Sequence, residues 1–146
     1  MPHLSLPIGS GGPVLECFIG VSAARAEALK KAAQPVPPPI HIRGLVDTGA
    51  SCTSVDPSIL KTLGVVSTGT VPVHTPSTKC GHPHVANQFD VCFVLNHPMI
   101  ARNFTALPVI ESDLEHQGIH ALIGRDILSF CLLTYDGQAG MFCLGF

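Results

Sequence analysis

The chain has 146 residues, of which 46% are hydrophobic and only 12% are charged, and its formal net charge is −2 at pH 7. This length suits a single domain with its own core. The eight lysines and arginines form no long basic run, so we expect no nucleic-acid partner. No apolar run is long enough to span a membrane, so we expect no membrane partner either.

The first thirteen residues have neither a basic region nor a long apolar stretch, so they do not resemble a secretory signal peptide. Six cysteines in a protein that is not exported are most simply free thiols in a reducing compartment. We therefore expect a cytoplasmic protein that needs no disulfide. The high apolar fraction for so small a domain also indicates that a partner covers part of its surface.

The first third of the chain predicts two strands joined by an insertion. Residues 13–21 and 40–46 are rich in β-branched and aromatic side chains, which favours strands. Between them, residues 22–34 are helix formers, and the prolines of 35–39 require an extended chain. We interpret 22–39 as a solvent-exposed helix followed by a stiff linker, with a partner-binding role as the alternative.

The middle of the chain predicts one helix and several strands. Asp56 can cap a helix that has Pro57 in its first turn and ends at Gly64. Residues 71–95 alternate and are interrupted at 75–83, which predicts a long hairpin. A turn at 96–98 should lead into another strand pair over 99–110, followed by a polar loop.

The last third predicts a buried strand over 119–124, a short helix that begins near Arg125, and a closing hairpin with Asp136 and Gly137 in its turn. Many short strands, few helices and frequent turn residues are typical of a mostly β domain closed as a barrel-like sandwich.

Two motifs carry the functional argument. In "LVDTGAS", residues 45–51, an ionisable side chain directly follows the end of an apolar strand. A carboxylate there loses part of its hydration, which is a poor position for a purely structural aspartate. Taken alone, the tripeptide would favour an ordinary strand and tight turn. The second motif is "ALIGRDIL", residues 121–128.

Together, in this order and spacing, the two motifs resemble those of the retropepsin family, the single-domain aspartic proteases related to retroviral protease. The resemblance extends from about residue 40 to the end of the chain. It implies an all-β fold: a closed β-barrel or sandwich with a flap hairpin and one short C-terminal helix. Residues 70–88 stand where the flap would be, and residues 1–146 would form one domain that carries the insertion at 22–39.

The resemblance also implies roles for the motif residues. Asp47 would be catalytic, Thr48 would hydrogen-bond across an interface, and Gly49 would let the substrate backbone approach closely. Ala50 completes the catalytic loop and cannot donate a hydrogen bond to Asp47, so we expect a mildly acidic optimum. The structural second motif comprises Gly124, Arg125 and Asp126.

The chemistry implied is hydrolysis of peptide bonds in extended polypeptide segments, with no cofactor and no metal. Two carboxylates about 3 Å apart share one proton, and the pair activates a water molecule. Only one Asp-Thr-Gly exists in the chain. A homodimer with twofold symmetry would supply the second Asp47, and family resemblance suggests that the terminal strand, around 141–146, contributes to its interface.

The insertion at 22–39 is longer than in viral enzymes, and the sequence departs from the viral pattern in two further places. Ser51 stands where viral enzymes usually carry an aspartate that pairs with the arginine of the second motif. Arg125 must therefore find another partner, and Asp126, Asp56 or a backbone carbonyl are the alternatives. The flap segment carries Pro72, Pro76 and Pro83 in place of a run of glycines, which predicts a stiffer or differently shaped hairpin.

Three other interpretations are compatible with the sequence. His74, Cys80, His82 and His84 offer zinc ligands, although their spacing matches no recognised finger. Cys52 lies near the first motif and could be a nucleophile, but no local motif supports it. The third is a catalytically silent retropepsin-like module that dimerises or binds peptides.

Overall fold

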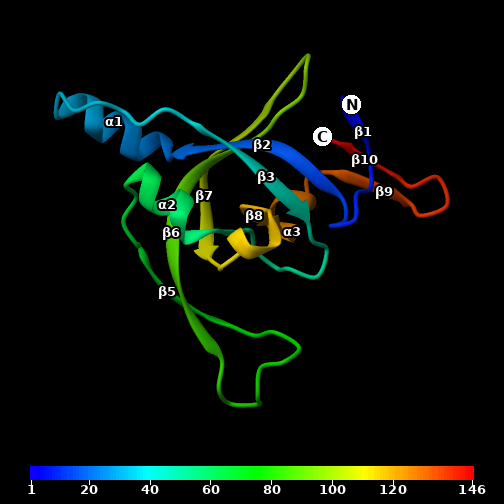
Figure 1. The fold of residues 1–146 in the computed structure, drawn as a ribbon. Helices are drawn as coiled ribbons and strands as arrows, with labels where there is room; N and C mark the ends of the chain where they lie inside the picture. The colour runs from blue at the N-terminus through cyan, green and yellow to red at the C-terminus, as the bar shows by residue number, and fades with distance from the viewer.

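The computed structural model describes residues 1–146 as a β-barrel with a smaller sheet beside it (Figure 1). The ten strands are β1 (His3–Pro7), β2 (Val14–Val21), β3 (Ile40–Val46), β4 (Ser54–Val55), β5 (Gly69–Val73), β6 (His84–Leu95), β7 (Arg102–Glu111), β8 (Ala121–Ile123), β9 (Leu132–Asp136) and β10 (Met141–Gly145). The helices are α1 (Ala23–Lys31), α2 (Pro57–Leu63) and α3 (Arg125–Leu128), with a 3₁₀ turn at Glu115–Gln117. None of these helices is long and apolar enough to cross a membrane.

The larger sheet has the strand order β2-β3-β8-β4-β7-β6-β5. A further antiparallel pairing of β2 with β6 closes all of these strands except β5 into a barrel, as the sequence predicted. Closure removes the exposed edges that an open sheet would present. Strand β5 pairs only with β6 and extends away from the barrel as one arm of a hairpin (Figure 1).

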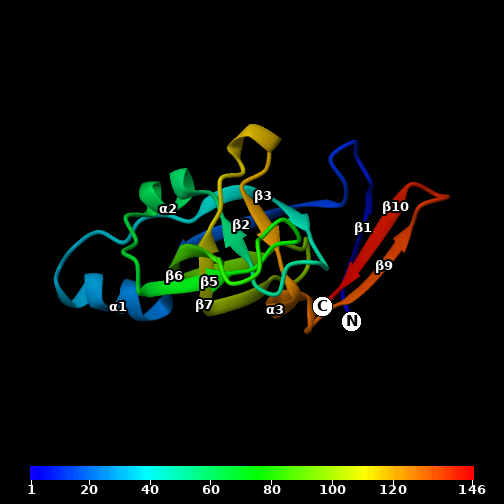
Figure 2. The same cartoon turned by 90° about the horizontal axis from the view of Figure 1, so that it is seen from below.

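The smaller sheet, which we call the terminal sheet, has the order β1-β10-β9. It holds both chain ends and lies to one side of the barrel in both views (Figures 1 and 2). Its middle strand is β10, whose two edges are paired with β1 and β9.

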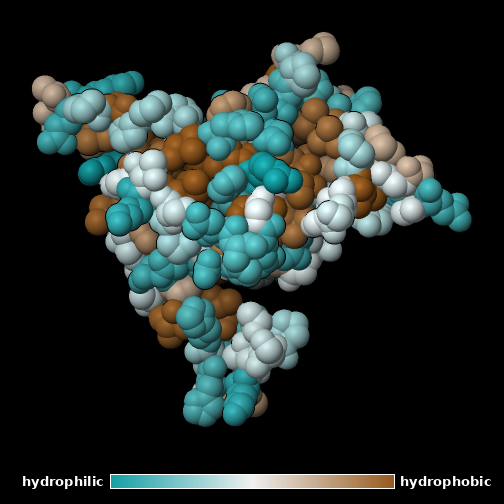
Figure 3. Space-filling model, in the orientation of Figure 1, coloured by the Kyte–Doolittle hydropathy of each residue, from teal (hydrophilic) through white to brown (hydrophobic).

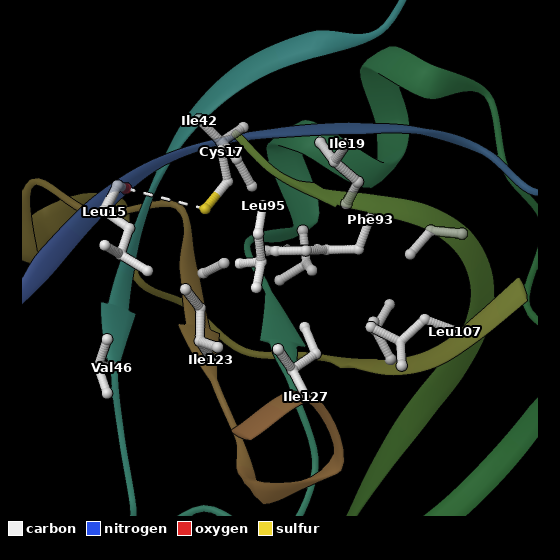
Figure 4. Packing of buried hydrophobic residues seen from close by; sticks show 14 of the residues in the cluster. Leu15, Cys17, Ile19, Ile42, Val46, Phe93, Leu95, Leu107, Ile123 and Ile127 are labelled. Atoms are coloured by element: carbon white, nitrogen blue, oxygen red, sulfur yellow. Dashed lines mark hydrogen bonds between the residues drawn. The ribbon is translucent and has the colours of Figure 1, made fainter. Parts of the chain in front are cut away.

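The core fills the barrel with aliphatic and aromatic side chains. Side chains from β2, β3, β6 and β8 point toward one another in its interior, and Ile127 enters from α3 (Figure 4). Burying Ile127 fixes α3 against the barrel, which matters because α3 carries the second motif.

Helix α2 begins and ends where the sequence predicted, whereas α1 begins as predicted but ends at Lys31, before the predicted end at residue 34. The Ser22 hydroxyl accepts from the Arg25 amide at the start of α1. Asp56 caps α2, Pro57 opens it, and Gly64 ends it in the left-handed conformation with φ of 65°. Residues 32–39 return to the barrel without regular structure.

The structure differs from the sequence prediction in three strands. The two-residue strand β4 was not predicted. Strand β1 was not predicted, although Leu4, Leu6 and Ile8 alternate and pack against the core. The strand pair expected over 99–110 is wrong: a single strand, β7, pairs with β6 from Arg102 to Ile110. The break expected near residue 98 is the turn of that long hairpin.

Candidate functional site

Asp47 lies at the point where β3 leaves the barrel. Strands β3 and β8 run parallel and pair through Val46 and Ile123. The pairing extends one step further, since the Asp47 amide donates to the Ile123 carbonyl at 3.0 Å. The carboxylate is half-buried, and its Oδ1 accepts a hydrogen bond from the Gly49 amide at 2.9 Å. The backbone therefore fixes the direction of the carboxylate.

Arg125 holds the loop that follows Asp47. Its guanidinium donates to the carbonyl of Thr48 at 2.8 Å and to that of Gly49 at 3.3 Å. Its own amide donates to the Ala50 carbonyl at 2.9 Å. Of the three partners that the sequence left open for Arg125, the structure selects backbone carbonyls.

Asp126 ties the two motifs together from the buried side. Its carboxylate accepts from the Thr53 amide at 2.8 Å and from the Thr53 hydroxyl at 2.7 Å. The same hydroxyl accepts from the Gly124 amide at 3.1 Å. Thr53 is fully buried, so these bonds are shielded from water and strongly constrain the loop.

Gly124 is required by the close approach of the two motifs. A Cβ at this position would lie 2.5 Å from the Cys52 carbonyl carbon and 2.6 Å from its oxygen. Both atoms belong to the backbone, so no side-chain rotation relieves the clash. The predicted residues Asp47, Gly49, Ala50 and Arg125 are thus brought together, with Gly124 and Asp126 beneath them.

A cavity of about 710 Å³ opens beside Asp47. Its walls come from the loop after Asp47, from β7 and the residues that follow it, and from the β5–β6 hairpin. On the hairpin, Val73 lies directly opposite His84 and both line the cavity, with Ala86 two residues further along the same face of β6. The segment expected to be a flap therefore forms one wall of the space that contains the aspartate.

Thr48 is exposed, and no side chain of its own chain accepts its hydroxyl hydrogen bond. The loop that carries it leaves β3 on the side of the barrel nearest the terminal sheet (Figures 1 and 2).

The two alternative chemistries find little support in the geometry. His74, Cys80, His82 and His84 do not gather into any group of three ligands that could hold a metal ion. Burial raises the pKa of the Cys52 thiol, the Asp126 carboxylate raises it further, and a hydrogen bond with Ser51 offsets part of the rise. A raised pKa is the opposite of what activates a cysteine nucleophile. All six cysteines are free.

Asp56 is a structural carboxylate. Burial alone would raise the pKa of Asp56, but hydrogen bonds from Ser58, Leu114 and Glu115 outweigh it and lower the pKa to about 2. Oδ1 accepts from the Ser58 hydroxyl and amide, and Oδ2 accepts from the amides of Leu114 and Glu115 at 2.9 and 2.8 Å. Asp56 thereby joins the start of α2 to the loop after β7.

The sequence did not predict two features of the site. The Thr53–Asp126 bonds join residues 73 positions apart, and neither residue is unusual in its local context. Ser54 lines the cavity in a strand of only two residues. The one signal in the sequence is a serine between two β-branched residues, Thr53 and Val55.

Comparison with known proteins supports a fold assignment. No protein-family model matches the chain, and no curated protein matches it. Among solved structures, a retropepsin-like aspartic protease from Rickettsia conorii matches with a TM-score of 0.59 at 15% identity, covering 99% of this chain and 91% of that one. The retroviral protease-like domain of Ddi1 from Leishmania major matches with a TM-score of 0.40 at 16% identity, covering 86% and 82%. The likeness to the rickettsial structure, together with the closed barrel described above, shows that this chain has a retropepsin-like fold.

Proposed function

We propose that this chain is an aspartic endopeptidase whose catalytic pair consists of Asp47 from two copies in a homodimer. The observation that carries the proposal is the position of Asp47. Its carboxylate is fixed by the Gly49 amide at the end of a barrel strand, and it lines a cavity large enough for a peptide segment.

The chemistry follows from two carboxylates that share a single proton. The ionised Asp47 takes a proton from a water molecule lying between the pair, and the resulting hydroxide equivalent attacks the carbonyl carbon of the peptide bond. The protonated Asp47 donates to the carbonyl oxygen as negative charge develops there. The tetrahedral intermediate then collapses as the C–N bond breaks. The leaving nitrogen accepts the proton that the first Asp47 took from water, and the second Asp47 takes a proton back from a hydroxyl of the intermediate, so the pair again holds one proton.

The second motif supports this chemistry by positioning the loop. Arg125 donates to two carbonyls of the Asp47–Ala50 segment, which orients the amide of Gly49 toward the carboxylate. Asp126 and Gly124 form hydrogen bonds with Thr53, and these bonds hold the start of β4 against the second motif. None of these three residues needs to touch the substrate.

A homodimer is needed because each chain has one Asp-Thr-Gly. The exposed Thr48 hydroxyl is available to the matching loop of a second copy. Apolar side chains are exposed on and next to the terminal sheet: Leu132 is 62% and Tyr135 58% exposed on β9, and Phe130, two residues before β9, is 54% exposed. Figure 3 shows hydrophobic side chains reaching the surface on this side of the molecule.

The terminal strand, which family resemblance places at the interface, has no free edge for pairing with a second copy. Strand β10 is the middle strand of the terminal sheet, so both of its edges are already used. The free edges belong to β9 and β1. We therefore propose that β9, which carries Leu132 and Tyr135, pairs with the second copy along its free edge. Strand β10 would contact the second copy only through side chains on its faces.

The substrate we propose is an extended polypeptide segment with apolar residues at the cut. The β5–β6 hairpin forms one wall of the cavity, and a peptide in extended conformation can bond to such a wall through its backbone while its side chains alternate between pockets. This geometry predicts internal cleavage of unfolded segments and inhibition by statine-type mimics of the tetrahedral intermediate.

Asp47→Asn tests the proposal directly. We expect cleavage of an unfolded protein substrate to fall by several orders of magnitude while the dimer persists, because the amide cannot take a proton from water. Asp90→Asn is the matched control: Asp90 is exposed on β6 and does not line the cavity. Equal activity in the wild type and in Asp47→Asn would contradict the proposal and favour a silent binding module.

A further inference from the structure

Arg102 is a half-buried arginine whose N–H groups have no acceptor within the chain. The other three arginines of the chain are exposed. Two of them, Arg43 and Arg125, donate to backbone carbonyls, whereas the Arg102 guanidinium makes no hydrogen bond and no ion pair. Polar groups withdrawn from water are nearly always paired, and a guanidinium offers five N–H donors. The least exposed arginine is therefore the one that most needs an acceptor from outside the chain.

Two aromatic rings hold this guanidinium in place. The Arg102 Cζ lies 5.7 Å from the centre of the Phe104 ring and 5.3 Å from that of the Phe130 ring. The two rings also pack against each other, with their centres 5.9 Å apart. Contacts with aromatic rings involve the flat face of a guanidinium and leave its edge, which carries the N–H donors, free. Arg102 is thus positioned for an acceptor with two oxygens in one plane, which is a carboxylate.

The free donors of Arg102 lie beside the start of β9. Phe130 stands two residues before this strand, and Cys131 directly precedes it. Burial raises the pKa of the Cys131 thiol, and the nearby Arg102 guanidinium offsets part of that rise, so the two groups are close. Phe130 and Leu132 are 54% and 62% exposed. Arg102 therefore borders the edge strand that we assign to the dimer.

The terminal sheet contains one acidic side chain, that of Asp136. This residue is exposed and ends β9, which runs outward from the barrel in both views (Figures 1 and 2). Its Oδ1 accepts hydrogen bonds from the amides of Gln138 and Ala139 at 3.0 and 2.9 Å. Its Oδ2 accepts none within the chain, and Asp136 forms no ion pair. The sheet thus has an unpaired cation near one end of β9 and an unpaired anion at the other.

Twofold symmetry would bring these two charges together. Two copies of one edge strand that are related by a twofold axis pair antiparallel. Complete overlap of the five-residue strands places Leu132 opposite Asp136 of the second copy. The outer end of one β9 then lies beside the barrel of the other copy, next to the segment that carries Phe130.

We propose that the Arg102 guanidinium binds the carboxylate of Asp136 from the second copy, and that this ion pair fixes the register of the two β9 edges. The inference rests on the proposed function, which requires a homodimer, and it names the residues by which one copy recognises the other. Symmetry forms the pair twice. Burial of Phe130 and Leu132 at the same edge would exclude water from the pair and strengthen it.

Two charge-reversed chains, Arg102→Glu and Asp136→Arg, test the pair by sedimentation equilibrium. Each alone should dimerise with a Kd raised about 100-fold, because both symmetric contacts become repulsive and each costs about tenfold. Mixed together, they should form a heterodimer with a Kd within about tenfold of the wild type, because both contacts again join opposite charges. The controls Arg25→Glu and Asp90→Arg change exposed side chains outside the terminal sheet and should dimerise as the wild type does.

The conservative variants Arg102→Gln and Asp136→Asn keep the test decisive if a reversed chain folds poorly. Asparagine retains an oxygen for the turn amides of Gln138 and Ala139. Each single variant should raise the Kd about tenfold or more, and the double variant should raise it no further, because the interaction is already lost. Single effects that add in the double variant would overturn the ion pair.

The outcomes separate this inference from the proposed function. If the wild type dimerises but the reversed chains dimerise equally well, the ion pair is overturned and the catalytic dimer stands. The same holds if folded reversed chains, as judged by circular dichroism, form no heterodimer when mixed. If the wild type is a monomer at every concentration tested, the ion pair and the proposed catalytic dimer are both overturned.

Discussion

Gly124 shows how a single residue sets the distance between the two motifs. Replacing it with alanine would place a methyl group against the Cys52 backbone at 2.5–2.6 Å. We expect Gly124→Ala to destabilise the protein by more than about 2 kcal/mol, because backbone atoms must move. Gly11→Ala is the control, since no atom lies within 4 Å of a Cβ there. Urea denaturation gives both values, and equal midpoints would contradict the geometry.

Asp56 makes stability depend on pH. Its pKa is about 2 in the folded protein against an ordinary value of 3.8. The ionised carboxylate therefore contributes its full stabilisation of the fold above pH 3.8, and this stabilisation is lost as the pH falls toward 2. We expect the wild type to lose about 1–2 kcal/mol of stability across that range through this residue. Asp56→Asn should be less stable at pH 7, and the gap should close by pH 2. Urea titrations at several pH values test this, with Asp90→Asn expected to follow the wild type; a gap independent of pH would contradict it.

Single residues could be predicted from the sequence where their immediate neighbours indicate their role. Asp47 stood out because a carboxylate directly follows an apolar strand, and Asp56 because it precedes a proline and a helical pattern. The bonds between Thr53 and Asp126 could not be predicted, since they depend on the barrel bringing two distant segments together. The same reason left the partner of Arg125 undecided until the backbone carbonyls of the first motif were seen beside it.

Among the elements, the loop after β3 depends on α3 for its shape. Arg125→Gln removes the guanidinium bonds to Thr48 and Gly49. We expect kcat to fall about tenfold or more, because the Gly49 amide loses its fixed direction, while stability changes by less than about 1 kcal/mol at this exposed side chain. Arg43→Gln is a matched control, since Arg43 also donates to a backbone carbonyl, that of Gly118, but lies outside the cavity. Equal losses of activity in both variants would contradict a specific role for Arg125.

Elements with clear start and stop residues were predicted to within a residue or two. Strand β3 begins and ends as expected, and α2 has its predicted cap, opening proline and terminal glycine. Strand β1 was missed because its alternation is short and lies beside prolines and glycines that suggest a loop. Strand β7 was divided wrongly because its continuity is enforced by pairing with β6, which no local pattern reveals.

At the scale of the whole molecule, the proposed function gives the barrel and the terminal sheet separate roles. The barrel brings Thr48 and Arg125, which are 77 residues apart, into hydrogen-bonding contact and leaves a cavity beside them. The terminal sheet extends to one side with β9 as an open, partly apolar edge. Open edges of this kind favour pairing with another chain. One Asp47 in each copy, together with that edge, makes the dimer the unit that the proposed chemistry requires.

Mixing wild-type and Asp47→Asn chains tests that central claim most directly. The wild-type amount is held constant, at concentrations where sizing shows only dimer, and inactive chains are added under conditions that allow exchange. If the catalytic pair needs Asp47 from both copies, random exchange with a ninefold excess should reduce activity to about one tenth. Activity that stays constant while exchange is complete would show that one Asp47 suffices, and the proposed catalytic pair would be wrong.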